Sequence, residues 1–206
     1  MTGQRGRTLA ILQARTSSSR LPGKVLLPLA GEPMILRQLE RIARARWLDG
    51  IVVATSEDPS DDELAVLLAD SGYDYIRGSL EDVLARYVQT LDEYQPDVAV
   101  RLTADCPLIS PQVIDLVVER FHASSADYVS NTMNPTYPDG LDVEVVSASV
   151  LRTVVGEAVD PPEREHVTLG IYRQPERFSI EKVVDPSGLD HSQLRWTVDT
   201  AEDFDF

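Results

Sequence analysis

The 206-residue chain has little cysteine, little histidine and no long apolar run. Cys106 is the single cysteine, so neither an intrachain disulfide nor a cysteine-rich metal site can form. No apolar run approaches the roughly 18 residues that a membrane helix needs, and the N-terminal segment lacks the pattern of a secretory signal. We therefore expect a cytoplasmic protein with no membrane partner.

Positive charge is also scarce, because 19 Lys and Arg oppose 34 Asp and Glu and leave a net charge of −15. Such an acidic chain argues against nucleic acid as a partner. Nine of the basic residues lie in residues 1–46, where only Glu32 and Glu40 oppose them. This asymmetry favours a focused site for a small anion. For Arg37, Arg41, Arg44 and Arg46 the simpler interpretation is a solvated helix face.

Three common motifs are missing: the GxxxxGK[ST] phosphate loop, the GxGxxG dinucleotide fingerprint and the GxSxG elbow. Residues 12–31 read LQARTSSSRLPGKVLLPLAG instead, with Arg15, Arg20 and Lys24 around three serines. Backbone N–H groups of small residues can approach phosphate oxygens closely, and Arg and Lys neutralise their charge. On composition alone, phosphate binding and a plain solvated loop are equally open.

Strand and helix patterns alternate along the first 121 residues. Short apolar runs predict strands at 8–13, 51–55, 73–76 and 97–102. Helical spacing predicts helices at 35–43, 64–68, 83–91 and 111–121, the last with Ser110 as its N-cap. This order predicts an α/β domain with a mostly parallel central sheet flanked by helices.

The pattern changes after Phe121. Period-two alternation at 127–131 and 141–147 predicts a small antiparallel insertion, followed by a helix at 164–173 and strands near 178–184 and 194–198. No linker divides the chain. We expect one domain over residues 1–206, with residues 127–148 as the inserted segment.

Two aspartates follow predicted strands, at the edge where open parallel sheets bind ligands. Asp105 comes after the strand at 97–102 and Asp199 after the one at 194–198. One or two carboxylates together with substrate phosphates suit Mg²⁺. The alternative is a turn aspartate at Asp105 and an N-cap at Asp199, with Glu202 completing a capping box. The acidic run at 56–63 is interpreted as a solvated loop and helix start.

Four strings in order, LQARTSSSRLPGKVLLPLAGEPM, LTADCPLI, REHVT and WTVDTAEDF, resemble the cytidylyltransferase family. The resemblance is strongest to the branch named for spore-coat polysaccharide biosynthesis, related to the CMP-Kdo and CMP-acylneuraminate synthetases. It implies a Rossmann-like nucleotidyltransferase fold and a homodimer. It also implies Mg²⁺-dependent transfer of CMP from CTP to a sugar, typically a 2-keto sugar acid, with release of pyrophosphate.

The resemblance also implies the site residues. Its nucleotide-binding positions fall on Gln13, Ala14, Arg15, Ser19, Arg20, Lys24, Thr103 and Asp105. Arg15, Lys24 and Asp105 would be catalytic, and Asp105 and Asp199 would bind the metal. Acceptor binding would involve Asn131 and Asp142 of the insertion, with Glu165 and His166. Ser17 and Ala104 stand where relatives commonly have glycine.

Other functions stay open on the sequence. The nucleotide could be UTP, the acceptor could be a phosphonate or phosphosugar, or the domain could bind without turnover. The presence of both aspartates beside Arg20 and Lys24 argues against a mere binder. A sugar-acid acceptor would need a cation for its carboxylate, and the unranked candidates are Arg77, Arg101, Arg164 and Arg195.

Overall fold

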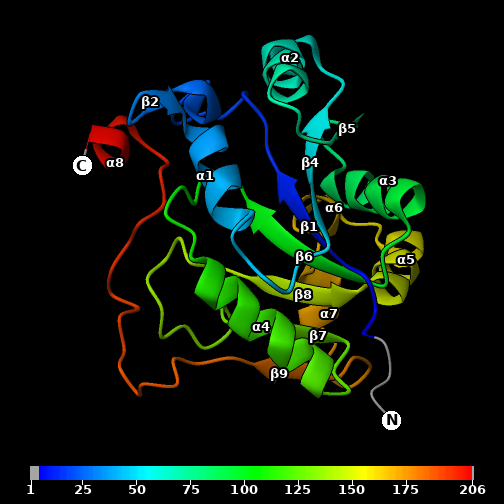
Figure 1. Cartoon of the computed structure of the whole chain (residues 1–206). Coiled ribbons are helices and arrows are strands. Elements are labelled where there is room, and N and C mark those ends of the chain that lie inside the picture. Colours follow the sequence, from blue (N-terminus) through cyan, green and yellow to red (C-terminus); the bar gives the residue numbers. More distant parts are fainter. Residues whose placement is uncertain (1–4, 206) are drawn as a thin grey trace.

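A computed structural model describes residues 5–205, and its centre is a seven-stranded sheet (Figure 1). The strand order is β5-β4-β1-β6-β8-β7-β9. The bounds are β1 (Thr8–Gln13), β4 (Gly50–Ser56), β5 (Tyr75–Gly78), β6 (Val98–Thr103), β7 (Tyr128–Ser130), β8 (Glu144–Ser147) and β9 (Ile180–Lys182). Only β8 runs antiparallel to its neighbours, so the expected mostly parallel sheet is confirmed.

Helices cover both faces of this sheet. The helices are α1 (Met34–Ile42), α2 (Asp62–Asp70), α3 (Val83–Tyr94), α4 (Pro111–Ala123), α5 (Ala148–Glu157), α6 (Pro161–Glu165), α7 (Leu169–Tyr172) and α8 (Ala201–Asp205). Strand β1 is apolar because both of its faces are buried. Ala10 and Leu12 join the core under α1, α2 and α4, whereas Leu9 and Ile11 join the core under α3, α5 and α7.

The predicted helix boundaries follow from local chemistry. Ser110 caps α4, since its hydroxyl accepts a hydrogen bond from the Val113 N–H at 3.4 Å. Asp82 caps α3 in the same way, through the Ala85 N–H at 2.9 Å. Gly72 ends α2 with a φ of 73°, a conformation that glycine adopts without strain. The four helices predicted before residue 121 are therefore confirmed.

Beyond residue 121 two helix predictions need correction. Helix α5 was not predicted. It follows β8 directly, and its N-cap residue Ser147 is the only residue that marks the boundary between strand and helix. The single helix expected at 164–173 is two short helices, α6 and α7, since His166 between them leaves the helical conformation with φ −100° and ψ 79°. Two small elements before α1 were also missed, the hairpin β2 (Pro28–Leu29) and β3 (Glu32–Pro33).

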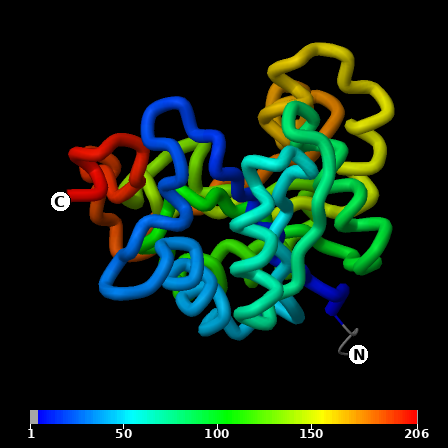
Figure 2. Tube along the Cα trace, turned by 90° about the horizontal axis from the view of Figure 1, so that it is seen from above, coloured from blue at the N-terminus to red at the C-terminus, as the bar shows by residue number. Residues whose placement is uncertain are grey.

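The prediction of a strand at 194–198 is wrong. This segment is an extended strap that forms only an isolated bridge between Asp139 and Arg195, and Leu194 and Trp196 are 47% and 38% exposed. Its apolar alternation therefore covers a surface rather than pairing in the sheet. The strap returns the C-terminal part of the chain (red) to the loop after β1 (blue), as Figure 2 shows, and the Val198 N–H donates to the Asp105 carbonyl at 2.8 Å.

The helix after the strap is capped differently from the alternative considered above. Thr200, and not Asp199, precedes α8, and the Asp203 N–H donates to the Thr200 hydroxyl at 3.3 Å. The Asp203 carboxylate accepts from the Thr200 N–H at 2.8 Å, which completes a capping box. The side chain of Asp199 is thereby left to other partners. Among residues 5–205, no helix is long and apolar enough to cross a membrane.

Candidate active site

The loop after β1, residues 14–24, is held by a buried aspartate on the neighbouring segment. Asp61 Oδ1 accepts a hydrogen bond from the Thr16 N–H at 2.7 Å, and the Thr16 hydroxyl donates to the Ser60 carbonyl at 2.7 Å. The other carboxylate oxygen of Asp61 bonds to the Ser56 hydroxyl and N–H. Burial alone would raise the pKa of Asp61, but the hydrogen bonds from Ser56 and Thr16 outweigh it and hold the pKa below 3.8.

Asp61 was missed by the sequence interpretation, which treated residues 56–63 as a solvated loop. Its neighbours Asp58, Asp62 and Glu63 are exposed, whereas Asp61 is fully buried. Nothing in the acidic run distinguishes one carboxylate from the next. The fold makes the distinction, because β1 and β4 are adjacent parallel strands whose carboxyl-end loops meet.

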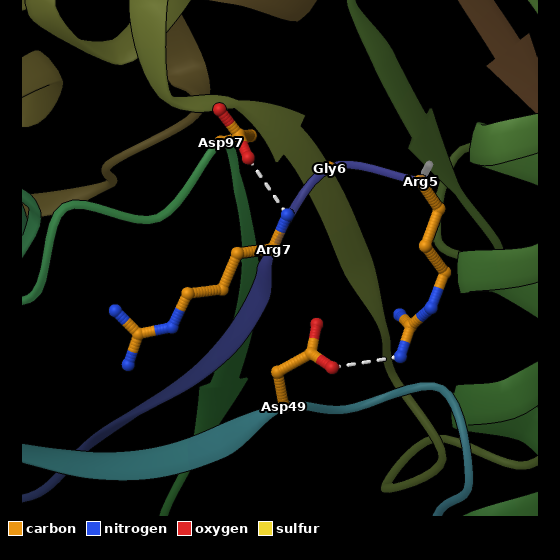
Figure 3. A pocket seen from close by; sticks show the side chains of 5 residues that line it. All are labelled: Arg5, Gly6, Arg7, Asp49 and Asp97. Atoms are coloured by element: carbon orange, nitrogen blue, oxygen red, sulfur yellow. Dashed lines mark hydrogen bonds and ion pairs between the residues drawn. The ribbon is translucent and has the colours of Figure 1, made fainter. Parts of the chain in front are cut away.

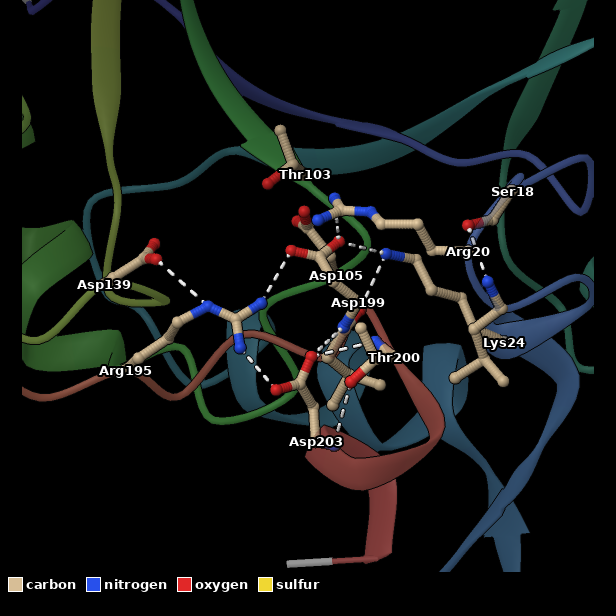
Figure 4. A network of polar contacts seen from close by, with 12 residues as sticks. Ser18, Arg20, Lys24, Thr103, Asp105, Asp139, Arg195, Asp199, Thr200 and Asp203 are labelled. Atoms are coloured by element: carbon tan, nitrogen blue, oxygen red, sulfur yellow. Dashed lines mark hydrogen bonds and ion pairs between the residues drawn. The ribbon is translucent and has the colours of Figure 1, made fainter.

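Lys24 and Asp199 form the centre of a charged network at this edge of the sheet (Figure 4). Lys24 is buried, and its Nζ donates to the Val198 carbonyl at 2.7 Å and contacts Asp199 Oδ1 at 3.0 Å. Arg20 contacts the same oxygen at 2.9 Å, and Arg195 contacts Asp199 Oδ2 at 2.8 Å. Burial opposes ionisation of Asp199, but the cations, Lys24 foremost, lower its pKa.

This network lines a cleft of about 240 Å³, called here the β1 cleft. Its walls are Gln13, Arg15, Ser18, Ser19, Arg20, Lys24, Val25, Thr103, Ala104, Asp105 and Asp199. The structure thus brings together every predicted nucleotide-binding residue except Ala14, and both predicted metal ligands. Ala14 lines a smaller adjoining hollow with Gln13, Arg15, Val83, Arg86 and Glu165.

The donor set of the β1 cleft fits a hard divalent cation. Asp105 is half-buried and has no ion-pair partner among the described residues, whereas Asp199 already contacts three cations. Residues 5–205 contain no cluster of three or more His, Cys, Asp or Glu arranged to hold a metal ion. Two carboxylates leave most positions to water and phosphate, which is the usual arrangement for Mg²⁺.

The two positions where relatives commonly have glycine are unstrained here. Among the described residues, Ala30 and Gln95 are the non-glycine residues with positive φ, so neither Ser17 nor Ala104 needs a glycine conformation. Ser17 is exposed, and Ala104 is buried with its N–H donating to the Gln13 carbonyl at 3.1 Å. A side chain at these positions is therefore compatible with the loop as it stands.

A second cavity, of about 430 Å³, lies between β6, β8 and the segment around α7, and is called here the insertion pocket. Its walls are Arg101, Thr132, Met133, Asp142, Glu144, His166, Thr168 and Tyr172. Of the predicted acceptor residues, Asp142 and His166 line it. Glu165 turns instead toward Arg15, at 4.0 Å.

Asn131, the fourth predicted acceptor residue, is buried and does not line the insertion pocket. Its amide nitrogen donates to the Leu141 carbonyl, and its amide oxygen accepts from the Val143 N–H, each at 2.8 Å. These bonds hold the residues on either side of Asp142. Asn131 therefore fixes the backbone that presents this carboxylate.

Arg101 and Glu144 form a buried ion pair at the base of the insertion pocket, with side chains 15% and 9% exposed. Glu144 also accepts hydrogen bonds from the Tyr128 hydroxyl at 2.6 Å and from the Thr168 hydroxyl. Burial opposes the charge of Glu144, but Arg101 and these hydroxyls lower its pKa. Among the four arginine candidates Arg101 alone lines this pocket, and the acid opposite it was not predicted.

Arg86 is a further residue that the sequence did not single out. It is 2% exposed, lines the small hollow beside Ala14, and its Nε has no hydrogen-bond partner among the described residues. Its Nη1 donates to the Ser79 carbonyl at 2.7 Å. In the sequence Arg86 is an ordinary polar residue on an amphipathic helix, so no local signal marks it.

A larger hollow of about 700 Å³ lies at the opposite end of β1, among Arg5, Gly6, Arg7, Asp49 and Asp97 (Figure 3). Arg5 pairs with Asp49 at 2.8 Å, and the Arg7 N–H donates to Asp97 at 2.7 Å. The Arg7 guanidinium donates to the Tyr94 carbonyl, so both arginines are engaged at this end of the strand. These arginines therefore add nothing to the β1 cleft, and the basic N-terminal quarter of the sequence serves two separate places.

Comparison with known proteins shows which family the chain belongs to. Residues 9–206 match the family described as cytidylyltransferase. The spore coat polysaccharide biosynthesis protein SpsF of Bacillus subtilis (strain 168) is 34% identical over 202 residues, which cover 96% of this chain and 83% of that protein. A solved cytidylyltransferase structure from Leptospira borgpetersenii serovar Hardjo-bovis superposes with a TM-score of 0.92 at 32% identity, covering 97% of this chain and 84% of that one.

A more distant structure shares the fold. The CMP:2-keto-3-deoxy-manno-octonic acid synthetase complexed with CTP superposes with a TM-score of 0.72 at 18% identity, covering 97% of this chain and 95% of that one. The family match spans nearly the whole chain and includes the β1 cleft and the insertion pocket. This chain belongs to the cytidylyltransferase family of nucleotidyltransferase enzymes.

Proposed function

We propose that the protein transfers CMP from CTP to a hydroxyl of a sugar and releases pyrophosphate, with Mg²⁺ bound by Asp105 and Asp199. One observation carries the proposal: a single cleft at the carboxyl ends of β1 and β6 contains both carboxylates together with Arg15, Arg20 and Lys24. A triphosphate matches that combination of cations and carboxylates. We also propose that the protein binds CTP and a sugar as a homodimer, as the family resemblance implies.

The proposed reaction forms a bond between the acceptor oxygen and the α-phosphorus. The bond from that phosphorus to the oxygen bridging to the β-phosphorus breaks, the acceptor hydroxyl loses its proton, and pyrophosphate leaves. Bound Mg²⁺ supplies charge neutralisation at the phosphate oxygens. Positioning and charge stabilisation contribute most of the catalysis in such transfers.

The chain's own residues have distinct roles in this scheme. Lys24 is fixed by the Val198 carbonyl, so its charge is positioned before substrate arrives. The side chain of Arg20 is 62% exposed, so it can move to contact the phosphates of a bound triphosphate. The turn held by Thr16 places Ser18 and Ser19 on the cleft wall.

Replacement of Asp105 tests the proposal. The variant Asp105→Asn removes the carboxylate that has no cation partner, and we expect kcat for pyrophosphate release to fall at least about 100-fold. Thermal unfolding should show a folded protein that still binds CTP. The control is Asp70→Asn, an exposed aspartate at the end of α2, which should turn over normally. Near-normal turnover of Asp105→Asn would exclude the proposed metal role.

A further inference from the structure

A hydrogen bond links the wall of the insertion pocket to the wall of the β1 cleft. Gln13 lines the β1 cleft, and its side-chain oxygen accepts a hydrogen bond at 3.1 Å from Nε of Arg101, which lines the insertion pocket. If CTP occupies the cleft as proposed above, the insertion pocket is the neighbouring space for the acceptor. The charges on its walls then decide which class of acceptor can enter.

A sugar acid would need a free cation for its carboxylate, and three of the candidate arginines are engaged elsewhere. Arg77 pairs with Asp62 at 2.7 Å and Arg164 pairs with Asp82 at 3.2 Å. Arg195 contacts three carboxylates, those of Asp139, Asp199 and Asp203. None of these three arginines lines the insertion pocket.

Arg101 does line the pocket, but its charge is compensated within the protein. Glu144 faces it as a buried partner, and Glu144 is itself fixed by the hydroxyls of Tyr128 and Thr168. Nη1 of Arg101 contacts Glu144 and its Nε donates to Gln13, so two of its three nitrogens are engaged. A carboxylate ligand in this pocket would share the one guanidinium with Glu144 and would also face Asp142, and these like charges oppose its binding.

The remaining charged wall residue is acidic. Asp142 is half-buried and, within residues 5–205, makes no hydrogen bond and no ion pair. The Asn131 amide holds the backbone on both sides of it. A half-buried carboxylate without a protein donor needs donors from a ligand. Hydroxyl and ammonium groups provide such donors, whereas a carboxylate does not.

We propose that the insertion pocket accepts a sugar that carries no carboxylate, a neutral or amine-bearing sugar with a hydroxyl or ammonium group donating to Asp142. This inference rests on the proposed function and narrows its acceptor. It departs from the 2-keto sugar acids that the family resemblance implied. The wall carries the balanced Arg101–Glu144 pair and the additional negative charge of Asp142. This net negative charge repels anions and attracts cations.

A cysteine placed in the pocket measures this charge without knowledge of the acceptor. Met133 lines the pocket, and Met133→Cys is treated with the cationic reagent 2-(trimethylammonium)ethyl methanethiosulfonate and the anionic reagent 2-sulfonatoethyl methanethiosulfonate. The parent chain is the blank, because its Cys106 is buried. We expect the cationic-to-anionic rate ratio to exceed that of free 2-mercaptoethanol about tenfold. Adding Asp142→Asn should remove most of the excess, and a ratio at or below that of the free thiol overturns the proposal.

A substrate panel completes the test. Pyrophosphate release from CTP is measured with N-acetylneuraminate and 3-deoxy-manno-octulosonate, and with neutral and amino sugars such as mannose and glucosamine. Faster release with a sugar acid than with every neutral or amino sugar overturns the inference while it supports the transferase. A cationic preference at Met133→Cys without release from any acceptor supports the charge of the pocket and contradicts the proposed transfer.

Discussion

At the residue scale, the carboxylates near the two cavities have opposite electrostatic surroundings. Asp199 and Asp61 are held ionised by cations or hydrogen-bond donors, so their pKa values are low. Burial, foremost, together with the nearby charges of Asp139, Glu144 and Asp105, raises the pKa of Asp142 to about 6. The same residue type therefore stabilises the fold at one position and weakens it at another.

The raised pKa of Asp142 predicts a stabilising substitution. The folded protein holds a proton on Asp142 that the unfolded chain releases near pH 3.8, so this residue reduces stability as the pH rises through about 6. We expect Asp142→Asn to raise the free energy of unfolding by about 1–2 kcal/mol near pH 8, after allowance for solvent screening. The gain should vanish below about pH 4. Urea unfolding at both pH values checks this, and a less stable variant near pH 8 would contradict it.

The lowered pKa of Asp61 predicts a destabilising substitution. Its folded pKa lies below the unfolded value of 3.8, so its contribution is complete above that value and is lost as the pH falls through the folded pKa. Asp61→Asn should cost about 2–3 kcal/mol near pH 7 and less near pH 3. Because the β1 loop then loses its anchor, KM for CTP should rise as well. The exposed neighbour Asp62→Asn is the matched control for stability, and equal effects of the two variants would argue against the anchor.

At the scale of elements, the strap at 194–198 leads directly into Asp199 and packs against a glycine of the insertion. Gly140 has a φ of 106°, and a Cβ there would lie 2.8 Å from the Trp196 carbonyl carbon and 3.0 Å from the Thr197 nitrogen. The Asp139 carbonyl accepts from the Trp196 N–H at 2.6 Å, so the two segments lie in direct backbone contact. The strap can approach the insertion only where no side chain intervenes.

Gly140→Ala should therefore displace the strap and Asp199 with it. We expect a loss of about 3 kcal/mol in the free energy of unfolding, from strained φ and backbone overlap together, and a loss of most turnover. Gly188→Ala is the control, because its φ of 76° is equally positive but no atom lies within 4 Å of a Cβ there. That variant should lose about 1 kcal/mol and keep its activity. Similar losses in both variants would show that the contact with the strap is unimportant.

The elements also show how far sequence reasoning reaches. Strands and helices with their own core face and cap, such as β1 and α4, were predicted because local pattern and fold agree. The segment at 194–198 alternates like a strand, yet no neighbouring strand pairs with it along its length. The members of the β1 cleft were predictable from strand ends and motif resemblance. Asp61, Arg86 and Glu144 were not, since only tertiary burial separates them from surface charges.

At the scale of the whole molecule, an acidic protein with a net charge of −15 has to bind an anion. The basic residues of the N-terminal quarter divide by position. Arg5 and Arg7 lie at the far end of the sheet. Arg37 donates to the Leu29 carbonyl and Arg41 to the Ile109 carbonyl, so these two side chains of α1 hold neighbouring loops in place. Arg15, Arg20 and Lys24 remain for the β1 cleft.

Ligand binding should therefore stabilise the whole fold. CTP with Mg²⁺ at about 100 times its Kd is expected to add about 2.7 kcal/mol, which corresponds to a rise of about 5–10 °C in Tm for a chain of this size. Thermal unfolding with CTP and with UTP measures both the binding and the base preference. An equal shift with UTP would contradict the assignment of the nucleotide as CTP.

The proposed reaction moves the nucleotidyl group of CTP, and not its terminal phosphate, onto the acceptor. The most direct measurement supplies CTP labelled with ³²P at either the α- or the γ-phosphorus, together with Mg²⁺ and a neutral or amino sugar, and separates the products. We expect the α-label on the sugar and the γ-label in pyrophosphate. A γ-label on the sugar, or both labels remaining in CTP for every acceptor tried, would contradict the proposed reaction.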